Sequence, residues 1–354
     1  MPLRLDQLGR RVVVRRLLPG ETGPSGGPAM SDVLGILETW DDVELSVRRE
    51  DGRVFHIAHG DIVTAKPVPP RASVRQRIPA ADVERICSRG WQPTDQQELG
   101  DWLLRAAGGF TGRANSALVT GDPGLPIKAA LDQLTRWYVD RNLPVLAQVI
   151  TDSDWLHELQ SRGWSSARPD QSDVLVQVGS LSRARRARRG GRSPSRPAAS
   201  EDGTPVTSAP QLQAVPDEDW IRLYGRTAGL DTEVVCAVLT SGERVTFASI
   251  RDPASDGVTV AIGRGVVTGD WLGLAAVEVQ PPCRRRGLGR AIVDSLLEWG
   301  VSCGALSAYA QVLADNNAAL ALYERYGFRT HHTYRYLRPP PMTRPVASTV
   351  SLDN

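Results

Sequence analysis

Residues 277–290 read VEVQPPCRRRGLGR, and this stretch decides the fold of the second half of the chain. An apolar run of strand type ends in a loop rich in arginine and glycine, and the loop opens a helical pattern. Glycines let a backbone close around a ligand, and the N–H groups at a helix N-terminus favour negative charge. Arginines add bidentate donors beside them. The stretch therefore predicts a cradle for a phosphate group.

A second motif lies in residues 316–328, which read NNAALALYERYGF. Together with the spacing Arg284-x-x-Gly287-x-Gly289, it resembles the two signatures of the GNAT N-acetyltransferases. These signatures are an acyl-CoA loop, Gln/Arg-x-x-Gly-x-Gly/Ala, and the pattern Asn-x-x-Ala-x-x-Leu-Tyr-Glu-x-x-Gly-Phe. Two independent motifs in the right order make the resemblance specific. It covers the last third of the chain.

The resemblance implies an acyltransferase for groups other than aminoacyl groups, with acetyl-CoA as co-substrate and no metal. In the family a central strand splits from its neighbour, and the pantetheine arm fills the gap like an added strand. The strand residues at that position are Val277, Glu278 and Val279, and a nearby N–H would polarise the thioester carbonyl. The residues expected to hold the pyrophosphate through backbone N–H groups are Arg285, Arg286, Gly287, Leu288, Gly289 and Arg290. Asn316 would contact the cofactor from the last helix.

Tyr323 is the candidate general acid, because a phenol within hydrogen-bond reach can protonate the leaving thiolate. The alternative is a tyrosine that only packs on its helix. Glu278 is one candidate base, directly or through water, although strand alternation leaves open which way it faces. Some relatives carry a glutamate on the next strand, where this chain has Gln311, which cannot act as a base. Cys283 has no adjacent histidine, so direct attack in a ternary complex is favoured over an acyl-enzyme.

An internal echo of the main motif lies in the middle of the chain. From Gly124 to Gln148 and from Gly287 to Gln311 the separation is 24 positions in both cases. This spacing indicates a second, degenerate GNAT-like unit. Its loop, residues 121–126, reads GDPGLP: two prolines lack N–H groups and an aspartate would repel a phosphate. Leu159 stands in the place of the candidate acid, so we expect a structural role and a single active site per chain.

The predicted fold class is α/β (α+β), with a mixed sheet in the catalytic unit. Residues 1–68 show five short strands and an Asp51-Gly52 hairpin signal, and they resemble an SH3-like β-barrel. Helical patterns are expected at 80–86 and 98–106. The predicted domains are 1–68 (barrel), 75–180 (degenerate GNAT-like unit), 181–211 (disordered Arg-rich linker), 212–340 (catalytic GNAT domain) and 341–354 (disordered tail).

Composition limits the partners. The net charge is +2, and residues 181–211 carry seven arginines against two acids, so nucleic acid is expected only through this linker. The four cysteines form no metal-type pair, and no apolar run approaches the roughly 20 residues of a membrane span. No signal peptide is visible at the N-terminus, so a cytoplasmic location is expected.

The whole arrangement resembles bacterial histone-acetyltransferase-like GNAT proteins, and we expect an N-acetyltransferase acting on a primary amine. The acceptor is a small molecule, a protein N-terminus or a lysine, and its contacts are expected from residues 220–229 and 330–338. The alternative is a CoA-sensing regulatory or nucleic-acid-associated module with little turnover. The sequence does not determine the acceptor, the base, the role of the barrel or the oligomeric state.

Overall fold

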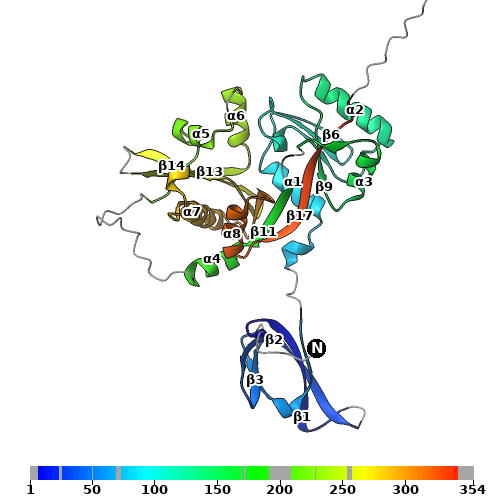
Figure 1. Ribbon diagram of the computed structural model, residues 1–354, viewed down its shortest axis with the longest axis vertical. Helices are drawn as coiled ribbons and strands as arrows, with labels where there is room; N and C mark the ends of the chain where they lie inside the picture. Colours follow the sequence, from blue (N-terminus) through cyan, green and yellow to red (C-terminus); the bar gives the residue numbers. More distant parts are fainter. Residues whose placement is uncertain are drawn as a thin grey trace, which may run out of the picture. The chain divides into compact units, whose positions relative to one another are not determined.

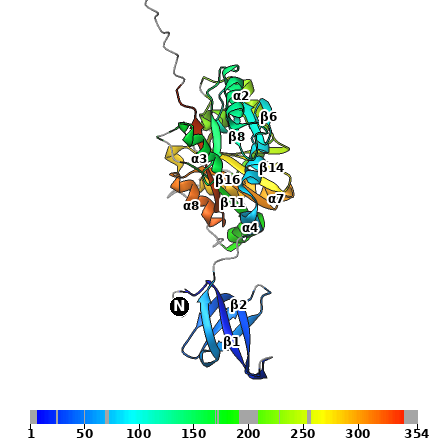
Figure 2. The same cartoon turned by 90° about the vertical axis from the view of Figure 1, so that its right-hand side faces the viewer.

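The computed structural model describes residues 7–23, 26–49, 51–68, 73–168, 170, 173–190, 209–227, 229–252 and 257–341. The chain divides into two compact units, Met1–Ser73 and Val74–Asn354, each with its own buried core (Figure 1, Figure 2). Residues 191–208, in the predicted linker, and residues 342–354, in the predicted tail, lie outside the described residues. The disorder expected there stays a prediction.

The first unit is a five-stranded antiparallel sheet in the order β4-β3-β2-β1-β5. Its strands are β1 (Arg11–Thr22), β2 (Pro28–Trp40), β3 (Glu44–Arg48), β4 (Val54–Ala58) and β5 (Ile62–Pro67). Alternate residues of β1 turn inward, so that Val12 and Val14 are buried while Arg15 is exposed. Gly52 has a φ of +86° in the β3–β4 turn, the left-handed conformation that favours glycine. The five predicted strands and this turn are confirmed.

The second unit holds one mixed sheet of twelve strands in the order β12-β13-β14-β15-β16-β11-β17-β9-β8-β7-β6, with β10 paired to β17. In the first half of this unit the strands are β6 (Asp95–Leu99), β7 (Trp102–Ala106), β8 (Ala117–Val119), β9 (Ala147–Ile150), β10 (Ser165–Ser166) and β11 (Val174–Ser180). In the second half they are β12 (Gln211–Gln213), β13 (Arg244–Asp252), β14 (Val258–Thr268), β15 (Trp271–Val279), β16 (Ser307–Leu313) and β17 (Arg329–Arg338).

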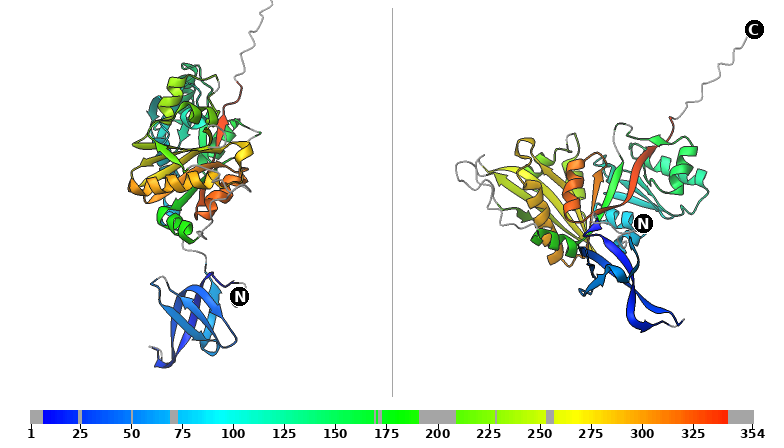
Figure 3. Two further views of the ribbon diagram at one scale, coloured as in Figure 1. Left: turned by 90° about the vertical axis from the view of Figure 1, so that its left-hand side faces the viewer. Right: turned by 60° about the horizontal axis from the view of Figure 1, so that its bottom comes forward.

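The two halves exchange strands. β11 comes from the first half, yet it lies between β16 and β17 of the second half. β17 in turn pairs with β9 and β10 of the first half. Figure 3 shows β17 running alongside strands of both halves. The sheet is therefore continuous across the whole unit, and each half is completed by a strand of the other.

Helices cover both faces of this sheet. They are α1 (Ala80–Arg89), α2 (Ile127–Val139), α3 (Asp154–Ser161), α4 (Leu181–Gly190), α5 (Glu218–Tyr224), α6 (Thr232–Leu239), α7 (Leu288–Ser302) and α8 (Asn317–Arg325). Ala261 packs in the cluster that contains α7, whereas the next residue, Ile262, packs in the cluster that contains α5 and α6. Successive strand residues point to opposite faces, so α7 lies on one face and α5 and α6 lie on the other.

Two sequence predictions are corrected by these elements. The helical pattern at 98–106 is wrong, because this segment belongs to the β6–β7 hairpin with Gly100 at φ +55° in its turn. Trp102 and Leu104 are fully buried on alternate positions of β7, so strand packing overrides the helical propensity. Residues 181–190 of the predicted linker form α4 instead, since Leu181 and Ala184 are buried beside α7. The ion pairs of Arg188 with Asp294 and Glu298 fix α4 there.

None of the helices in the described ranges is both long and apolar enough to cross a membrane. In the same ranges no group of three or more His, Cys, Asp or Glu side chains is placed to hold a metal ion.

Candidate active site

The central feature of the candidate site is a fork between β15 and β16. The parallel pairing of these strands runs from Trp271 with Ser307 to Leu274 with Ala310 and ends there. Beyond this point β15 continues along β14, and β16 continues along β11. In the described sheet, one edge of each strand is thus left unpaired past the fork. An extended ligand can add to such an edge through main-chain hydrogen bonds.

A β-bulge at the fork bends β15. Between Ile262 and Arg264 the partner strand advances by two residues, while β15 advances by three, from Ala275 to Glu278. The bulge contains Ala276, whose φ of +52° is in the left-handed region. A non-glycine residue there costs about 1–2 kcal/mol, so the surrounding fold must hold the bulge in place. The bulge therefore sets the direction of the predicted cofactor-contacting residues Val277, Glu278 and Val279.

The loop after β15 is the segment predicted to hold a phosphate group. Arg285 and Gly287 both have left-handed φ angles, +64° and +82°. Successive left- and right-handed residues turn neighbouring N–H groups toward a common point, which suits an anion. Gly287 caps the 15-residue helix α7, and a Cβ added to Gly287 would meet no atom within 4 Å. The first N–H groups of a helix have no acceptor within the helix. In α7 the N–H of Ala291 donates to the carbonyl of the capping residue Gly287 at 3.0 Å.

The arginine side chains of the loop are partly tethered. Arg284 donates from Nε to the carbonyl of Val279 at 3.2 Å. Arg286 lies 3.7 Å from a carboxylate oxygen of Asp252, and Arg290 lies 3.7 Å from one of Asp294. These contacts hold positive charge around the N-terminus of α7. Among the predicted pyrophosphate contacts, Leu288 is buried, and Gly289 lies close to Val279 of β15 and Leu322 of α8.

Glu278 faces the side of the sheet that carries α5 and α6. Its Oε1 lies 3.2 Å from a guanidinium nitrogen of Arg226, which follows α5. Its side chain is 29% exposed. Burial raises the pKa of the Glu278 carboxyl above its ordinary value, and Arg226 and Arg284 only partly offset this increase. A carboxylate whose pKa is raised is a better base near neutral pH.

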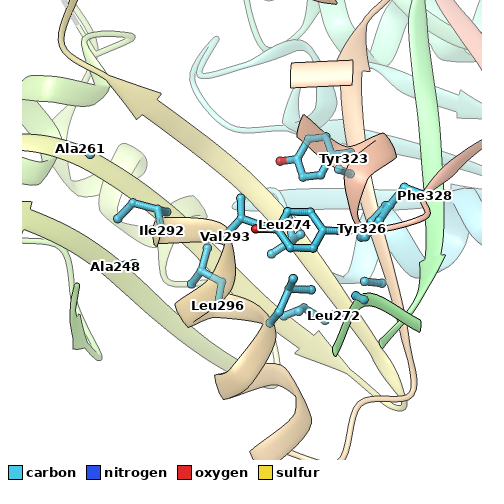
Figure 4. Close-up of a cluster of buried hydrophobic side chains, with 14 of the residues drawn as sticks. Ala248, Ala261, Leu272, Leu274, Ile292, Val293, Leu296, Tyr323, Tyr326 and Phe328 are labelled. Carbon is cyan, nitrogen blue, oxygen red and sulfur yellow. The ribbon is translucent and has the colours of Figure 1, made fainter. Parts of the chain in front are cut away.

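Tyr323 lies on α8 and packs on the other face, in the cluster that contains α7 and Leu274 (Figure 4). It is 4% exposed, and its ring centre is 5.4 Å from that of Phe328. Figure 4 shows its hydroxyl turned away from Phe328. Burial raises the pKa of the Tyr323 hydroxyl, so the group keeps its proton throughout the neutral range. The candidate base and the candidate acid are thus on opposite faces of β15.

Asn316 has a structural task at the start of α8. Its Oδ1 accepts a hydrogen bond from the N–H of Ala319 at 3.1 Å, which caps the helix that carries Tyr323. The neighbouring Tyr326 donates its hydroxyl to Asp294 of α7 at 2.8 Å. The second of these bonds joins the end of α8 to α7. The predicted cofactor contact of Asn316 stays a prediction.

Three residues at the candidate site were not predicted as site residues from the sequence. Arg226 lies within the segment expected to contact the acceptor, although no pattern singled it out. Arg113 and Trp91 come from the first half, where no motif marked them. Arg113 donates to Oε1 of Gln311 at 3.0 Å, and its guanidinium lies 4.1 Å from the centre of the Trp91 ring. Gln311 is the first residue of β16 past the fork, so the first half reaches the site directly.

Comparison with known proteins identifies the family. A family model described as "Probable histone acetyltransferase Rv0428c C-terminal" matches residues 80–337, and one described as "Rv0428c N-terminal Sm-like domain" matches residues 6–66. The chain is 29% identical over 339 residues to the probable histone acetyltransferase Rv0428c of Mycobacterium tuberculosis, covering 93% of this chain and 95% of the relative. It is 26% identical over 262 residues to the uncharacterized N-acetyltransferase YobR of Bacillus subtilis, covering 72% and 98%.

A solved structure supports the fold. The GCN5-related N-acetyltransferase from Kribbella flavida matches 74% of this chain and 95% of its own, with a TM-score of 0.53 and 17% identity. The family match also refines the first unit, which is Sm-like rather than of the predicted SH3-like type. The chain belongs to the Rv0428c family of GNAT-fold N-acetyltransferases and joins an N-terminal Sm-like domain to the C-terminal region that defines this family.

Proposed function

We propose that the protein transfers an acetyl group from acetyl-CoA to a primary amine by direct attack in a ternary complex. One observation carries the proposal: the fork between β15 and β16 leads into the cradle formed by Arg285 and Gly287. A strand edge that accepts an extended arm and a helix N-terminus that accepts a phosphate lie on consecutive residues. A strand edge followed by a helix N-terminus suits a pantetheine arm followed by a pyrophosphate.

The residues proposed to hold acetyl-CoA fit this ligand. Val277, Glu278 and Val279 offer main-chain groups on the open edge of β15. Arg285 to Arg290 surround the start of α7 with N–H groups and positive charge. The backbone past the bulge at Ala276 would polarise the thioester carbonyl. When bound, acetyl-CoA supplies the acyl carbon and the thiolate leaving group.

The proposed reaction uses one group on each face of β15. Glu278 takes a proton from the ammonium of the acceptor, directly or through water, because an ordinary amine near pKa 10 is otherwise protonated. The amine nitrogen then bonds to the acyl carbon, and the carbon–sulfur bond breaks as the nitrogen loses its second proton to solvent. Tyr323 gives its hydroxyl proton to the sulfur and takes a proton back from solvent. The tyrosine is buried and neutral in the described structure, as a proton donor must be.

The acceptor is proposed to be an amine of a protein or of a small molecule. The Mycobacterium tuberculosis relative is named a probable histone acetyltransferase, which favours a protein amine. We also propose a cytoplasmic location and expect nucleic-acid contact only through the arginine-rich segment. Part of that segment, α4, already uses Arg188 for ion pairs with α7.

Two measurements test the proposal. Calorimetric titration with acetyl-CoA should show one binding site per chain. Release of free thiol from acetyl-CoA should then depend on an added amine, tested with amino acids, polyamines, aminoglycosides, peptides and basic proteins. Binding without amine-dependent thiol release would favour a CoA-sensing module, and absence of binding would exclude both functions.

A further inference from the structure

A rigid loop of the first half of the second unit places an arginine at the candidate active site. This loop, residues 107–115, connects β7 to β8. The buried side chain of Asn115 binds it from inside: Oδ1 accepts from the N–H groups of Ala107 and Gly109, at 2.8 and 2.9 Å. Its Nδ2 donates to the carbonyls of Phe110 and Thr111, at 2.8 and 3.0 Å. Such a network leaves the loop little freedom.

The same loop holds an unusual backbone conformation. Thr111 has a φ of +60° with a ψ of 145°, a region that a β-branched residue rarely adopts. Its hydroxyl accepts a hydrogen bond from the indole N–H of Trp91 at 3.0 Å. Strained residues of this kind persist where the surrounding structure fixes them, and they concentrate at functional sites. Here the strained residue lies two positions before Arg113.

Arg113 reaches the fork. Its Nη1 donates to Gln311 at 3.0 Å, and Gln311 follows Ala310, the last residue of β16 that pairs with β15. Its guanidinium also lies over the Trp91 ring at 4.1 Å. Arg113 and Glu278 both influence the pKa of the Tyr224 hydroxyl, in opposite directions. Burial raises the pKa of the Tyr224 hydroxyl, Arg113 and Arg226 lower it, and Glu278 raises it.

The side of the fork that faces α5 and α6 carries an excess of positive charge. Arg264 is fully buried, and its guanidinium donates hydrogen bonds to the carbonyls of Leu239, Ser241 and Gly90, at 2.6, 2.6 and 3.0 Å. Burial lowers its pKa to about 10, so it stays charged at neutral pH. Arg226 is paired with Glu278.

Both oxygens of the nearby Glu84 carboxylate have other partners. One of its oxygens lies 2.8 Å from His332, and the other accepts from Gln148 at 2.7 Å. Among the described residues, no carboxylate lies within ion-pair distance of Arg113. A guanidinium has five N–H donors, and Gln311 takes one of those of Arg113.

We propose that Arg113 is a specificity-determining residue that binds a carboxylate of the acceptor, so that the preferred acceptor is a primary amine carrying a nearby acidic group. The inference rests on the proposed acetyl transfer and names the substrate class for it. The acid would come either from a small amino acid or from an acidic side chain next to the amine of a peptide. A planar guanidinium matches a carboxylate in two parallel hydrogen bonds, which fixes the direction of the amine.

The test compares acceptors that differ in the charge carried near the amine. In the first arm the acceptors are 4-aminobutanoate, 4-aminobutanamide and 1,4-diaminobutane. In the second arm they are peptides that begin Ala-Asp, Ala-Asn and Ala-Arg and are otherwise identical. We expect kcat/KM to fall from the acidic to the neutral to the basic member in at least one arm, and the arm that shows this order identifies the source of the carboxylate.

The variant Arg113→Gln should remove the preference. We expect kcat/KM for the acidic member to fall roughly tenfold to hundredfold, as for the loss of a charged hydrogen-bond partner, with the neutral member little changed. Arg113→Lys should restore part of the preference. The matched control is Arg136→Gln, an exposed arginine on α2 of the same half, which should change none of the acceptors. The affinity for acetyl-CoA and the melting temperature are measured for each variant.

Three outcomes would overturn the inference. The first is a wild-type order in both arms that favours the neutral or basic member, a result that needs no variant. The second is an equal loss for all members in Arg113→Gln, which is the signature of a purely structural arginine. The third is transfer to no member of either arm although another amine of the acceptor screen is acetylated. Failure of the proposed function is seen separately, as absence of acetyl-CoA binding or as absence of thiol release with every amine of that screen.

Discussion

The loops at residues 121–126 and 284–289 occupy equivalent places in the two halves. They differ in the charged groups that surround their backbone N–H groups. In the first loop the N–H of Asp122 donates to Asp101 Oδ2 at 2.8 Å, and the N–H of Gly124 donates to Asp122 Oδ1 at 2.8 Å. The chain thus fills this cradle with its own carboxylates. In the second loop arginines replace the acids. Equal spacing of the motif thus accompanies equivalent elements in the two halves, whereas the groups that surround the N–H donors differ.

The largest effect is expected when the second loop is given the residues of the first. The triple variant Arg285→Asp, Arg286→Pro and Gly289→Pro should weaken acetyl-CoA binding roughly a hundredfold or more, since several charged hydrogen bonds of about 1.5–3 kcal/mol each are lost. Proline is tolerated in the first turn of a helix, which suits Gly289→Pro. Because Arg286→Pro would follow the left-handed Arg285, the melting temperature of the variant is measured as well. Calorimetric titration measures the Kd. The reciprocal control, Asp122→Arg in the first loop, should leave the Kd unchanged, and a changed Kd in that control would contradict the assignment of one site per chain.

The difference between Tyr323 and its counterpart Leu159 gives the next largest effect. Tyr323→Phe should lower kcat by roughly 10²–10³, the range for loss of a general acid, with little change in KM for acetyl-CoA. Thiol release at saturating acceptor measures it. The matched control is Tyr326→Phe, which loses the bond to Asp294 and should cost about 1 kcal/mol of unfolding free energy while kcat is kept. Equal kcat in wild type and Tyr323→Phe would exclude the acid role.

The raised pKa of Glu278 predicts a pH dependence of the reaction. As a base Glu278 must be deprotonated, so kcat/KM should rise with pH through a pKa above the ordinary glutamate value. Glu278→Gln should lower kcat/KM by roughly 10²-fold and remove this acidic limb. Arg226→Ala should move the limb to higher pH, because Arg226 opposes the increase. An unmoved limb in both variants would assign it to another group.

The smallest effect concerns stability. A carboxyl whose pKa is raised on folding favours the protonated form, so its contribution to stability is fully present below the unfolded pKa and is lost as pH rises through the folded pKa. Glu278→Gln, which cannot ionise, should therefore unfold at a slightly higher temperature than wild type at neutral pH. The difference should vanish at acidic pH. Thermal unfolding followed by circular dichroism measures it, and a lower melting temperature at neutral pH would contradict the burial argument.

The sequence predicted those parts of the site that depend on local patterns. The loop at 284–289, the last helix with Tyr323 and the echo in the first half are all written in short stretches with fixed spacing. The left-handed φ of Arg285 could not be read, because arginine has no preference for that conformation. The hairpin at 95–106 was missed because the burial of Trp102 is a tertiary effect.

Long-range arrangements were beyond the sequence altogether. The approach of Arg113 to Gln311 joins residues 198 positions apart, and no local pattern encodes such a contact. The exchange of β11 and β17 is of the same kind, because β-pairing is decided by sheet packing rather than by the order of strands in the chain.

The strand exchange also constrains how this protein can change over time. A half that folded apart from the other could be deleted without harm to its neighbour. Here deletion of the first half would remove β11 from between β16 and β17, exposing two strand edges inside the second half. The second half therefore depends on the first for its fold, whereas the loop at 121–126 lies outside the strands that the two halves share.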